Sequence, residues 1–96
     1  MFSIEFKPEA FRQLKAIKRY YAAQIIHAIE VHLKHLPDKP SPPRIKIFKG
    51  RQRATYRLRE REYRIFYDIQ DNRVQILAVL HKSDTEMFYS KPATER

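Results

Sequence analysis

Residues 56–69 read Y-R-L-R-E-R-E-Y-R-I-F-Y-D-I, in which polar and apolar side chains alternate on both sides of a polar triplet, Glu60-Arg61-Glu62. Alternation with a period of two is typical of strands that are buried on one face. A short polar connection joins antiparallel neighbours. The segment therefore predicts a hairpin of two strands, over 55–59 and 63–69. In the second strand, one side carries Tyr63, Ile65, Tyr67 and Ile69, and the other carries Arg64, Phe66 and Asp68.

Two further strands are predicted beside this hairpin. Residues 45–48 precede it, separated by a turn at the chain's only glycine, Gly50. Residues 74–80 follow it after a turn at Asp71-Asn72, a residue pair that favours tight turns. The second half of the chain thus predicts four antiparallel strands.

The first 37 residues predict a strand and two helices. The strand alternates Phe2, Ile4 and Phe6 with polar residues and is closed by Pro8, which also suits the first turn of a helix. The first helix repeats apolar residues at helical spacing: Phe11, Leu14 and Ile17. The second, ended by Pro37, has an apolar stripe about 100° wide formed by Ala22, Ile25, Ile26, Ile29, Leu33 and Leu36. The predicted fold class is α+β, with a two-helix hairpin packed on the sheet and Phe2, Phe6 and Phe11 in the core.

The length of 96 residues suits one domain spanning 1–96. There is no cysteine, which excludes disulfides and thiolate chemistry. The longest apolar run is residues 76–80, so we expect neither an export signal nor a membrane span, and we expect a cytoplasmic protein.

Basic residues concentrate in one part of the predicted sheet. Residues 44–64 contain nine of the 20 lysines and arginines against two glutamates, a balance of +7 out of a total of +9. Cations interleaved with aromatic rings can neutralise phosphates and stack on unpaired bases. The sequence therefore predicts a nucleic-acid interface on the strands, with solvated strand faces as the alternative.

The order strand, two helices and four strands, with Y-R-L-R-x-x-x-Y-R-I-F-Y-D-I at 56–69 and V-L-H-K-S-D at 79–84, closely resembles the RelE/ParE toxin superfamily. The resemblance covers essentially the whole chain. It implies the toxin of a bacterial toxin–antitoxin pair. RelE-like members resemble microbial ribonucleases and cut messenger RNA on the ribosome, whereas ParE-like members poison DNA gyrase.

The RelE-like reading implies attack of a ribose 2′-hydroxyl on the adjacent phosphodiester, with no cofactor and no metal. That reaction needs a base, an acid and cations around the phosphorus. The resemblance places the cations at Arg57, Arg64 and Lys82, and the C-terminal tyrosine at Tyr89, or at position 88 if the spacing from Lys82 is kept. His81 is the other candidate for proton transfer, because its ordinary pKa lies near neutrality.

This chain departs from the RelE-like pattern at Thr55, where a lysine is expected. Neighbouring cations could compensate. The predicted RNA-binding residues are Lys46, Lys49, Arg51, Arg53, Tyr56, Arg59 and Phe66, with Tyr56 or Phe66 stacking on a base.

Three histidines, His27, His32 and His35, lie on the second predicted helix, away from the apolar stripe. They point in different directions around the axis and no cysteine or carboxylate stands at ligand spacing, so no zinc site is predicted.

The expected partners are messenger RNA on the ribosome and a cognate antitoxin, whose acidic or amphipathic segment would cover the cations or displace the tail from Ser83 onward. The complex would be a heterotetramer or a larger assembly. Two other functions stay open: a ParE-like gyrase inhibitor, and an inactive module that binds RNA or regulates.

Overall fold

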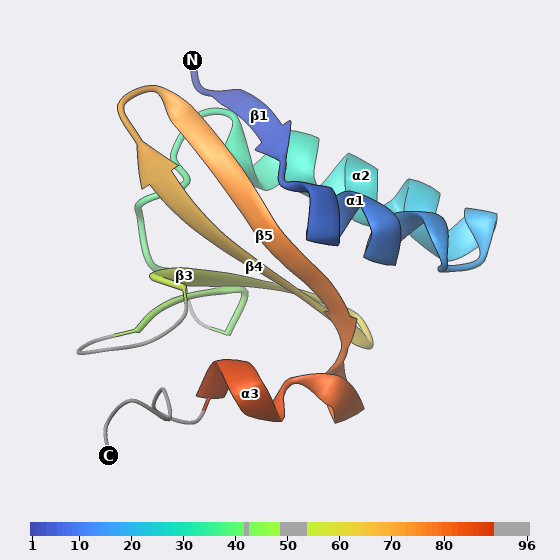
Figure 1. Cartoon of the computed structure of the whole chain (residues 1–96). Helices are drawn as coiled ribbons and strands as arrows, with labels where there is room; N and C mark the ends of the chain where they lie inside the picture. Colours follow the sequence, from blue (N-terminus) through green and yellow to red (C-terminus); the bar gives the residue numbers. More distant parts are fainter. Residues whose placement is uncertain (42, 49–53, 90–96) are drawn as a thin grey trace.

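The computed structural model describes residues 1–41, 43–48 and 54–89, and in it two helices cover one face of a sheet while a short third helix lies on the other (Figure 1). This α+β architecture is the predicted one. The elements are β1 (Ser3–Phe6), α1 (Pro8–Lys15), α2 (Arg19–Leu33), β2 (Ile45–Ile47), β3 (Tyr56–Glu60), β4 (Tyr63–Gln70), β5 (Arg73–His81), a 3₁₀ turn (Lys82–Asp84) and α3 (Glu86–Tyr89). No helix within the described ranges is long and apolar enough to cross a lipid bilayer.

The five strands form one sheet in the order β1-β5-β4-β3-β2. The four C-terminal strands are antiparallel, as predicted, and each begins and ends within one residue of its predicted bounds. β1 joins the sheet at its far edge and runs parallel to β5, with Ser3 opposite Arg73 and Phe6 opposite Ile76. The first strand of the chain is therefore paired with the last.

The two helices form the expected hairpin, separated by residues 16–18. α1 begins at Pro8, whose missing amide costs nothing in a first turn. α2 ends at Leu33, earlier than the predicted end at Pro37. The reason is that Pro37 has no amide to donate to the Leu33 carbonyl four residues before it. The next carbonyl, that of Lys34, accepts the backbone amide of Phe2 at 2.8 Å.

The main core lies between the helices and the sheet. α2 contributes Ile25, Ala28, Ile29 and Leu33, all at most 4% exposed. The sheet contributes fully buried side chains from three strands, namely Leu58, Ile65, Tyr67, Val74 and Ile76. Phe2 and Phe6 pack against this cluster as partly buried residues.

Three residues predicted in the core lie at the surface instead. Phe11 is 51% exposed, because α1 turns Ala10 and Leu14 to the sheet and leaves the Phe11 ring beside the Lys15 ammonium, 5.4 Å from its centroid. Leu36 is 59% exposed, because it follows the end of α2 and no longer lies on the helical stripe. Ile26, at the border of that stripe, is 41% exposed.

The opposite face of the sheet carries a smaller apolar cluster. Its buried members are Ala54, Phe66 and Ala78, and Phe48, Leu77, Leu80 and Phe88 pack against them. Phe88 belongs to α3, so this cluster fixes the short helix on the face that α1 and α2 leave uncovered (Figure 1).

A bulge in β5 sets which side chains reach each face. Ala78 lies opposite Phe66, but Ile76 lies opposite Tyr67, so Leu77 is an extra residue on its strand. Beyond β1, the edge of β5 is covered by α1, whose Gln13 Oε1 accepts the backbone amide of Val79 at 2.7 Å. A side chain of α1 thus satisfies this backbone amide of β5 at a position where β1 no longer pairs with β5.

Candidate nucleic-acid interface

Four cations form two cross-strand pairs on the face that carries α3. Lys46 of β2 lies opposite Arg57 of β3, and Arg59 of β3 lies opposite Arg64 of β4. We call these four residues the basic face. Like charges directly opposite each other repel, and a surface with this concentration of positive charge suits an anionic ligand. All four were predicted as site residues, and the structure brings them together on one face.

Arg57 is a partly buried cation of the basic face. Its Nη2 donates to the Pro43 carbonyl at 2.6 Å. Its Nε is buried and has no hydrogen-bond partner among the described residues. A buried donor without an acceptor costs roughly 1–3 kcal/mol, and a phosphate oxygen is an acceptor that a guanidinium binds well.

Arg64 is held at the turn between β3 and β4. Its Nη1 donates to the carbonyls of Arg61 and Tyr63, both at 2.9 Å. The turn itself is tight, because Arg61 adopts a positive φ of 55°. The guanidinium is thus positioned by backbone groups.

The centre of this face is covered by stacked aromatic rings. Phe66 stacks against Phe48 with ring centroids 6.2 Å apart, and against Phe88 at 4.4 Å. Phe66 is 0% exposed, so its ring is not accessible to a base, contrary to the predicted stacking role. Phe88 carries α3 across the face, and Tyr89 is the last residue of that helix.

His81 lies on the opposite side of the sheet from the arginines. It stands directly across from Tyr63, which packs on the main core, and the two rings meet edge to face with centroids 5.6 Å apart. Its Nδ1 accepts the Ser83 backbone amide at 3.2 Å and lies 2.9 Å from the Ser83 hydroxyl. In the neutral ring the proton is therefore on Nε2. His81 thus lies on the helix side of the sheet and Arg57 and Arg64 on the other. The charges of His81 and Arg64 nevertheless both act on Glu62 at the strand ends.

Lys82 is tied to the turn between β3 and β4. Its Nζ lies 3.0 Å from Glu62 Oε1, and its backbone amide donates to the Glu62 carbonyl at 2.7 Å. The hydrogen bond and the charge of Lys82 lower the pKa of the Glu62 carboxyl. Both side chains are more than half exposed, so the pair is open to solvent.

Tyr56 lies on the helix side, stacked on Tyr67 with ring centroids 5.1 Å apart. Burial raises its pKa. It is therefore not part of the basic face, unlike the predicted arrangement. Lys49, Arg51 and Arg53 lie outside the described residues.

Arg44 and Arg61 were included in the positive charge of residues 44–64 but were not predicted as site residues. Together with Arg59 they line an open hollow of about 680 Å³ beside the turn between β3 and β4. Glu60 contacts both: its carboxylate lies 3.5 Å from Arg44 Nη1 and 3.8 Å from Arg61 Nε. The polar triplet at 60–62 could have indicated this hollow. A charged turn between two basic strands places its side chains at the end of the sheet, beside the cations of those strands.

Among residues 1–41, 43–48 and 54–89, no three histidine or carboxylate side chains are grouped closely enough to hold a metal ion. One of the helical histidines, His32, instead lies near Arg44. Burial, followed by the charge of Arg44, lowers its pKa.

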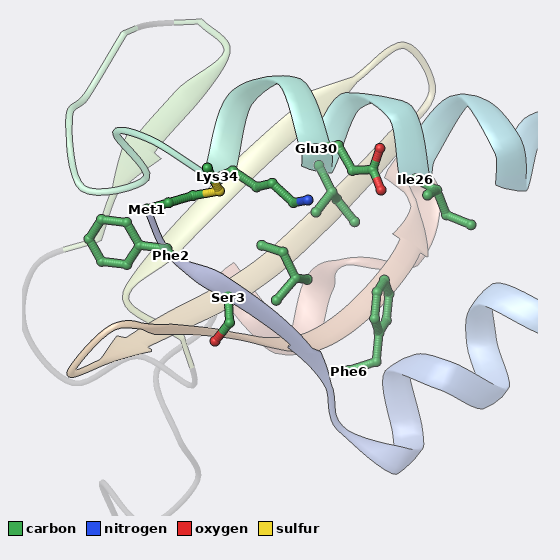
Figure 2. Close-up of a pocket in the computed structure, with 9 residues that line it drawn as sticks. Met1, Phe2, Ser3, Phe6, Ile26, Glu30 and Lys34 are labelled. Atoms are coloured by element: carbon green, nitrogen blue, oxygen red, sulfur yellow. The ribbon is translucent and has the colours of Figure 1, made fainter.

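An apolar hollow of about 540 Å³ lies elsewhere, between β1 and α2 (Figure 2). Phe6 reaches into it from β1, with Ile26 and Glu30 on α2 across from it (Figure 2). Its charged lining residues are Glu30 and Lys34, one of each sign. It therefore lacks the excess of cations that a nucleic-acid interface needs.

The comparisons with known proteins agree on the fold. Three similar solved structures are the RelBE2 toxin–antitoxin complex of Mycobacterium tuberculosis (24% identity, TM-score 0.68, 83% of this chain and 96% of that one), the RelB–RelE complex of Methanococcus jannaschii (21%, 0.65, 90% and 99%) and the YoeB dimer of Staphylococcus aureus (21%, 0.53, 80% and 92%). No curated protein sequence matches the chain.

A family model matches residues 4–86, and its description is the ParE toxin of type II toxin–antitoxin systems, parDE. The match begins within β1 and spans the other four strands and both long helices. The protein therefore belongs to the ParE toxin family of type II toxin–antitoxin systems, within the RelE/ParE superfamily.

Proposed function

We propose that this toxin is an endoribonuclease that cleaves messenger RNA on the ribosome without a metal ion. The observation that carries the proposal is the basic face, where Lys46 opposes Arg57 and Arg59 opposes Arg64. Four cations stand on one surface, and an RNA backbone carries the negative charge that such a surface binds. A ribosomal substrate would place the protein in the cytoplasm.

The proposed reaction is attack of a ribose 2′-oxygen on the adjacent phosphorus. The 2′-hydroxyl proton passes to a base, the bond from phosphorus to the 5′-oxygen breaks, and an acid protonates the departing 5′-oxygen. A 2′,3′-cyclic phosphate and a 5′-hydroxyl result. Arg57 and Arg64 bind the phosphate and stabilise the charge that develops on it. Lys82, at the end of β5, adds positive charge.

The proton-transfer role falls to the C-terminal segment and not to His81. His81 is across the sheet from both arginines, and its Nδ1 is occupied by Ser83. α3 is anchored on the same side of the sheet as the basic face by the contact between Phe88 and Phe66, and it ends at Tyr89. We therefore assign proton transfer to Tyr89, the C-terminal tyrosine that the family resemblance implies for this role.

The test is primer extension on messenger RNA from translating ribosomes treated with the purified toxin. Wild type should give discrete cuts, and Arg64→Ala and Tyr89→Phe should lower the cutting rate at least about 100-fold, the usual loss for a phosphate-binding or proton-transfer group. His81→Ala should lower the cutting rate far less, because His81 lies on the helix side of the sheet, away from Arg57 and Arg64. Arg73→Ala is the matched control for charge, because Arg73 is an exposed arginine at the opposite end of β4 and β5.

Inhibition of DNA gyrase is the second candidate. The match to the ParE family model favours it, and so does the separation of His81 from the arginines. A supercoiling assay with the same proteins decides between the two. Blocked supercoiling without cuts in messenger RNA would replace the ribonuclease proposal, and silence in both assays would leave a module that only binds RNA.

The proposed partner is a cognate antitoxin with an acidic or amphipathic segment. Carboxylates on that segment would pair with the basic face. Its apolar residues would replace Phe88 on Phe66 and displace α3. The neighbouring structures from Mycobacterium tuberculosis and Methanococcus jannaschii are themselves toxin–antitoxin complexes, and for this chain we propose a heterotetramer or a larger assembly.

A further inference from the structure

Two hollows of different chemistry meet at the turn between β3 and β4. They share Glu60, Arg61 and Glu62 as a common wall. The arginine hollow, of about 680 Å³, is lined by Arg44, Arg59 and Arg61. The aromatic hollow, of about 330 Å³, is lined by Tyr21, Tyr63, His81 and Gln24. A ligand that passes this turn would meet cations first and aromatic rings next.

The rings of the aromatic hollow belong to a continuous row at the surface. Tyr20 contacts Tyr21 with centroids 5.3 Å apart, Tyr21 lies 6.2 Å from Tyr63, and Tyr63 lies 5.6 Å from His81. Tyr20 is 69% exposed and Tyr21 42% exposed. Tyr63 also packs on the main core, but Tyr20 and Tyr21 keep much of their ring surface exposed. Exposed adjacent rings form a platform of the kind on which unpaired bases stack.

The charges around the aromatic hollow exclude a simple cation cage. The carboxylate of Glu60 is paired with Arg44 and Arg61, and that of Glu62 with Lys82. The negative charge is therefore already compensated. The lining is also too polar for an apolar helix, since Gln24, Arg61 and both glutamates take part in it.

We propose that the aromatic hollow binds an unpaired purine base of a single-stranded RNA, while the phosphates on either side of that base contact Arg59 and Arg61. This inference rests on the proposed ribonuclease function for the origin of the RNA. Arg59 belongs both to the basic face and to the arginine hollow, so one strand of RNA can continue from the cleaved phosphate round the turn. A purine is favoured because its two fused rings offer the larger stacking surface.

The base in this hollow would fix the register of the RNA on the basic face. Tyr21 acts there as a positioning residue that never touches the reacting phosphate. Loss of the Tyr21 ring should raise KM and make cleavage less selective among sites, with a smaller effect on kcat.

The experiment uses short single-stranded RNAs that carry the fluorescent base 2-aminopurine at successive positions, titrated with the full-length toxin. Stacking quenches this fluorophore, so one position should be quenched strongly. Tyr21→Ala should abolish that quenching and lower the affinity about tenfold, as expected for loss of one stacked base, without changing the salt dependence. Tyr21→Phe should restore both. Arg61→Ala should instead reduce the slope of log affinity against log salt by about 1.

Quenching that persists in Tyr21→Ala would overturn the inference. So would unchanged RNA affinity in Tyr21→Ala together with loss of copurification with the antitoxin, because the row would then be a protein-docking surface. Primer extension separates this failure from that of the proposed function. Cuts at unaltered positions in Tyr21→Ala would refute the base site alone, whereas normal quenching without any cuts would refute the ribonuclease alone.

Discussion

Arg59 of β3 lies directly opposite Arg64 of β4, on the side of the sheet that α1 and α2 leave uncovered. Replacing one partner by a neutral residue should relieve the repulsion. We expect Arg59→Gln to raise the free energy of unfolding by about 0.2–1 kcal/mol at low salt and to weaken RNA binding. Urea unfolding at low and high salt, beside RNA titrations, measures both effects.

Arg73→Gln is the control for this prediction, because Arg73 is equally a strand arginine but faces Gln70 at the other end of the hairpin. It should leave RNA binding unchanged. A loss of stability in Arg59→Gln that persists at high salt would show that Arg59 holds the fold, and the basic face would no longer carry an unfavourable charge pair.

Phe88 anchors α3 through its ring contact with Phe66, at 4.4 Å and 17°. Phe88→Ala should release the short helix and cost about 1–3 kcal/mol, since the ring is only partly buried. Hydrogen exchange at residues 82–89 should accelerate while that of β3 and β4 does not. Phe88→Leu keeps an apolar contact, so its exchange rate at residues 82–89 should lie between those of wild type and Phe88→Ala. Equal exchange in all three proteins would show that Phe88 does not anchor α3.

Tyr67 donates its hydroxyl to the Pro37 carbonyl at 2.7 Å inside the core. Burial raises its pKa well above the ordinary tyrosine value of 10.0. The unfolded chain therefore releases this proton first as the pH rises, so the stability that neutral Tyr67 contributes is complete below pH 10 and declines above it. One proton corresponds to about 1.4 kcal/mol per pH unit.

Tyr67→Phe tests this assignment. At neutral pH it should cost about 1–3 kcal/mol, because the Pro37 carbonyl loses its donor. Above pH 10 its stability should fall less steeply than that of wild type. Tyr56→Phe is the matched control, since burial raises that pKa as well but Tyr56 is only partly buried. Parallel alkaline curves for wild type and Tyr67→Phe would contradict the prediction.

Gln13 of α1 accepts the Val79 amide at the edge of β5, where β1 no longer pairs with it. Gln13→Leu should leave that amide without an acceptor and lower the unfolding free energy by about 1–3 kcal/mol. Gln13→Glu keeps an acceptor for the Val79 amide and should retain most of the unfolding free energy. Urea unfolding would refute this role of Gln13 if both variants were equally stable.

The strands could be predicted because their signal is local. Alternation over 63–69 places Ile65 and Tyr67 on the helix side and Arg64 and Phe66 on the other, as the structure shows. The partner of β1 could not be predicted in this way, since nothing in residues 3–6 indicates a strand 70 positions away as a parallel neighbour. Phe11 was misplaced because helical spacing alone does not tell which flank of a stripe faces the sheet.

The position of His81 depends on a single residue that the sequence does not mark. In a regular β5, Val74, Ile76, Ala78 and Leu80 would share one face. The bulge at Leu77 exchanges the faces beyond it, so Val79 and His81 join Ile76 on the helix side and Leu80 moves to the other. Because of this exchange, His81 lies on the face of the sheet opposite the basic face. Its position in sequence beside Lys82 therefore does not place it with the arginines.

The pairing of β1 with β5 also has a consequence for how the toxin is made. A ribosome releases residues 3–6 long before residues 73–76, and closing a loop of about 70 residues is slow compared with forming the local hairpins. The N-terminal strand therefore stays unpaired until residues 73–76 have been synthesised and have left the ribosome. Until then the edge of the sheet that β1 will occupy is incomplete.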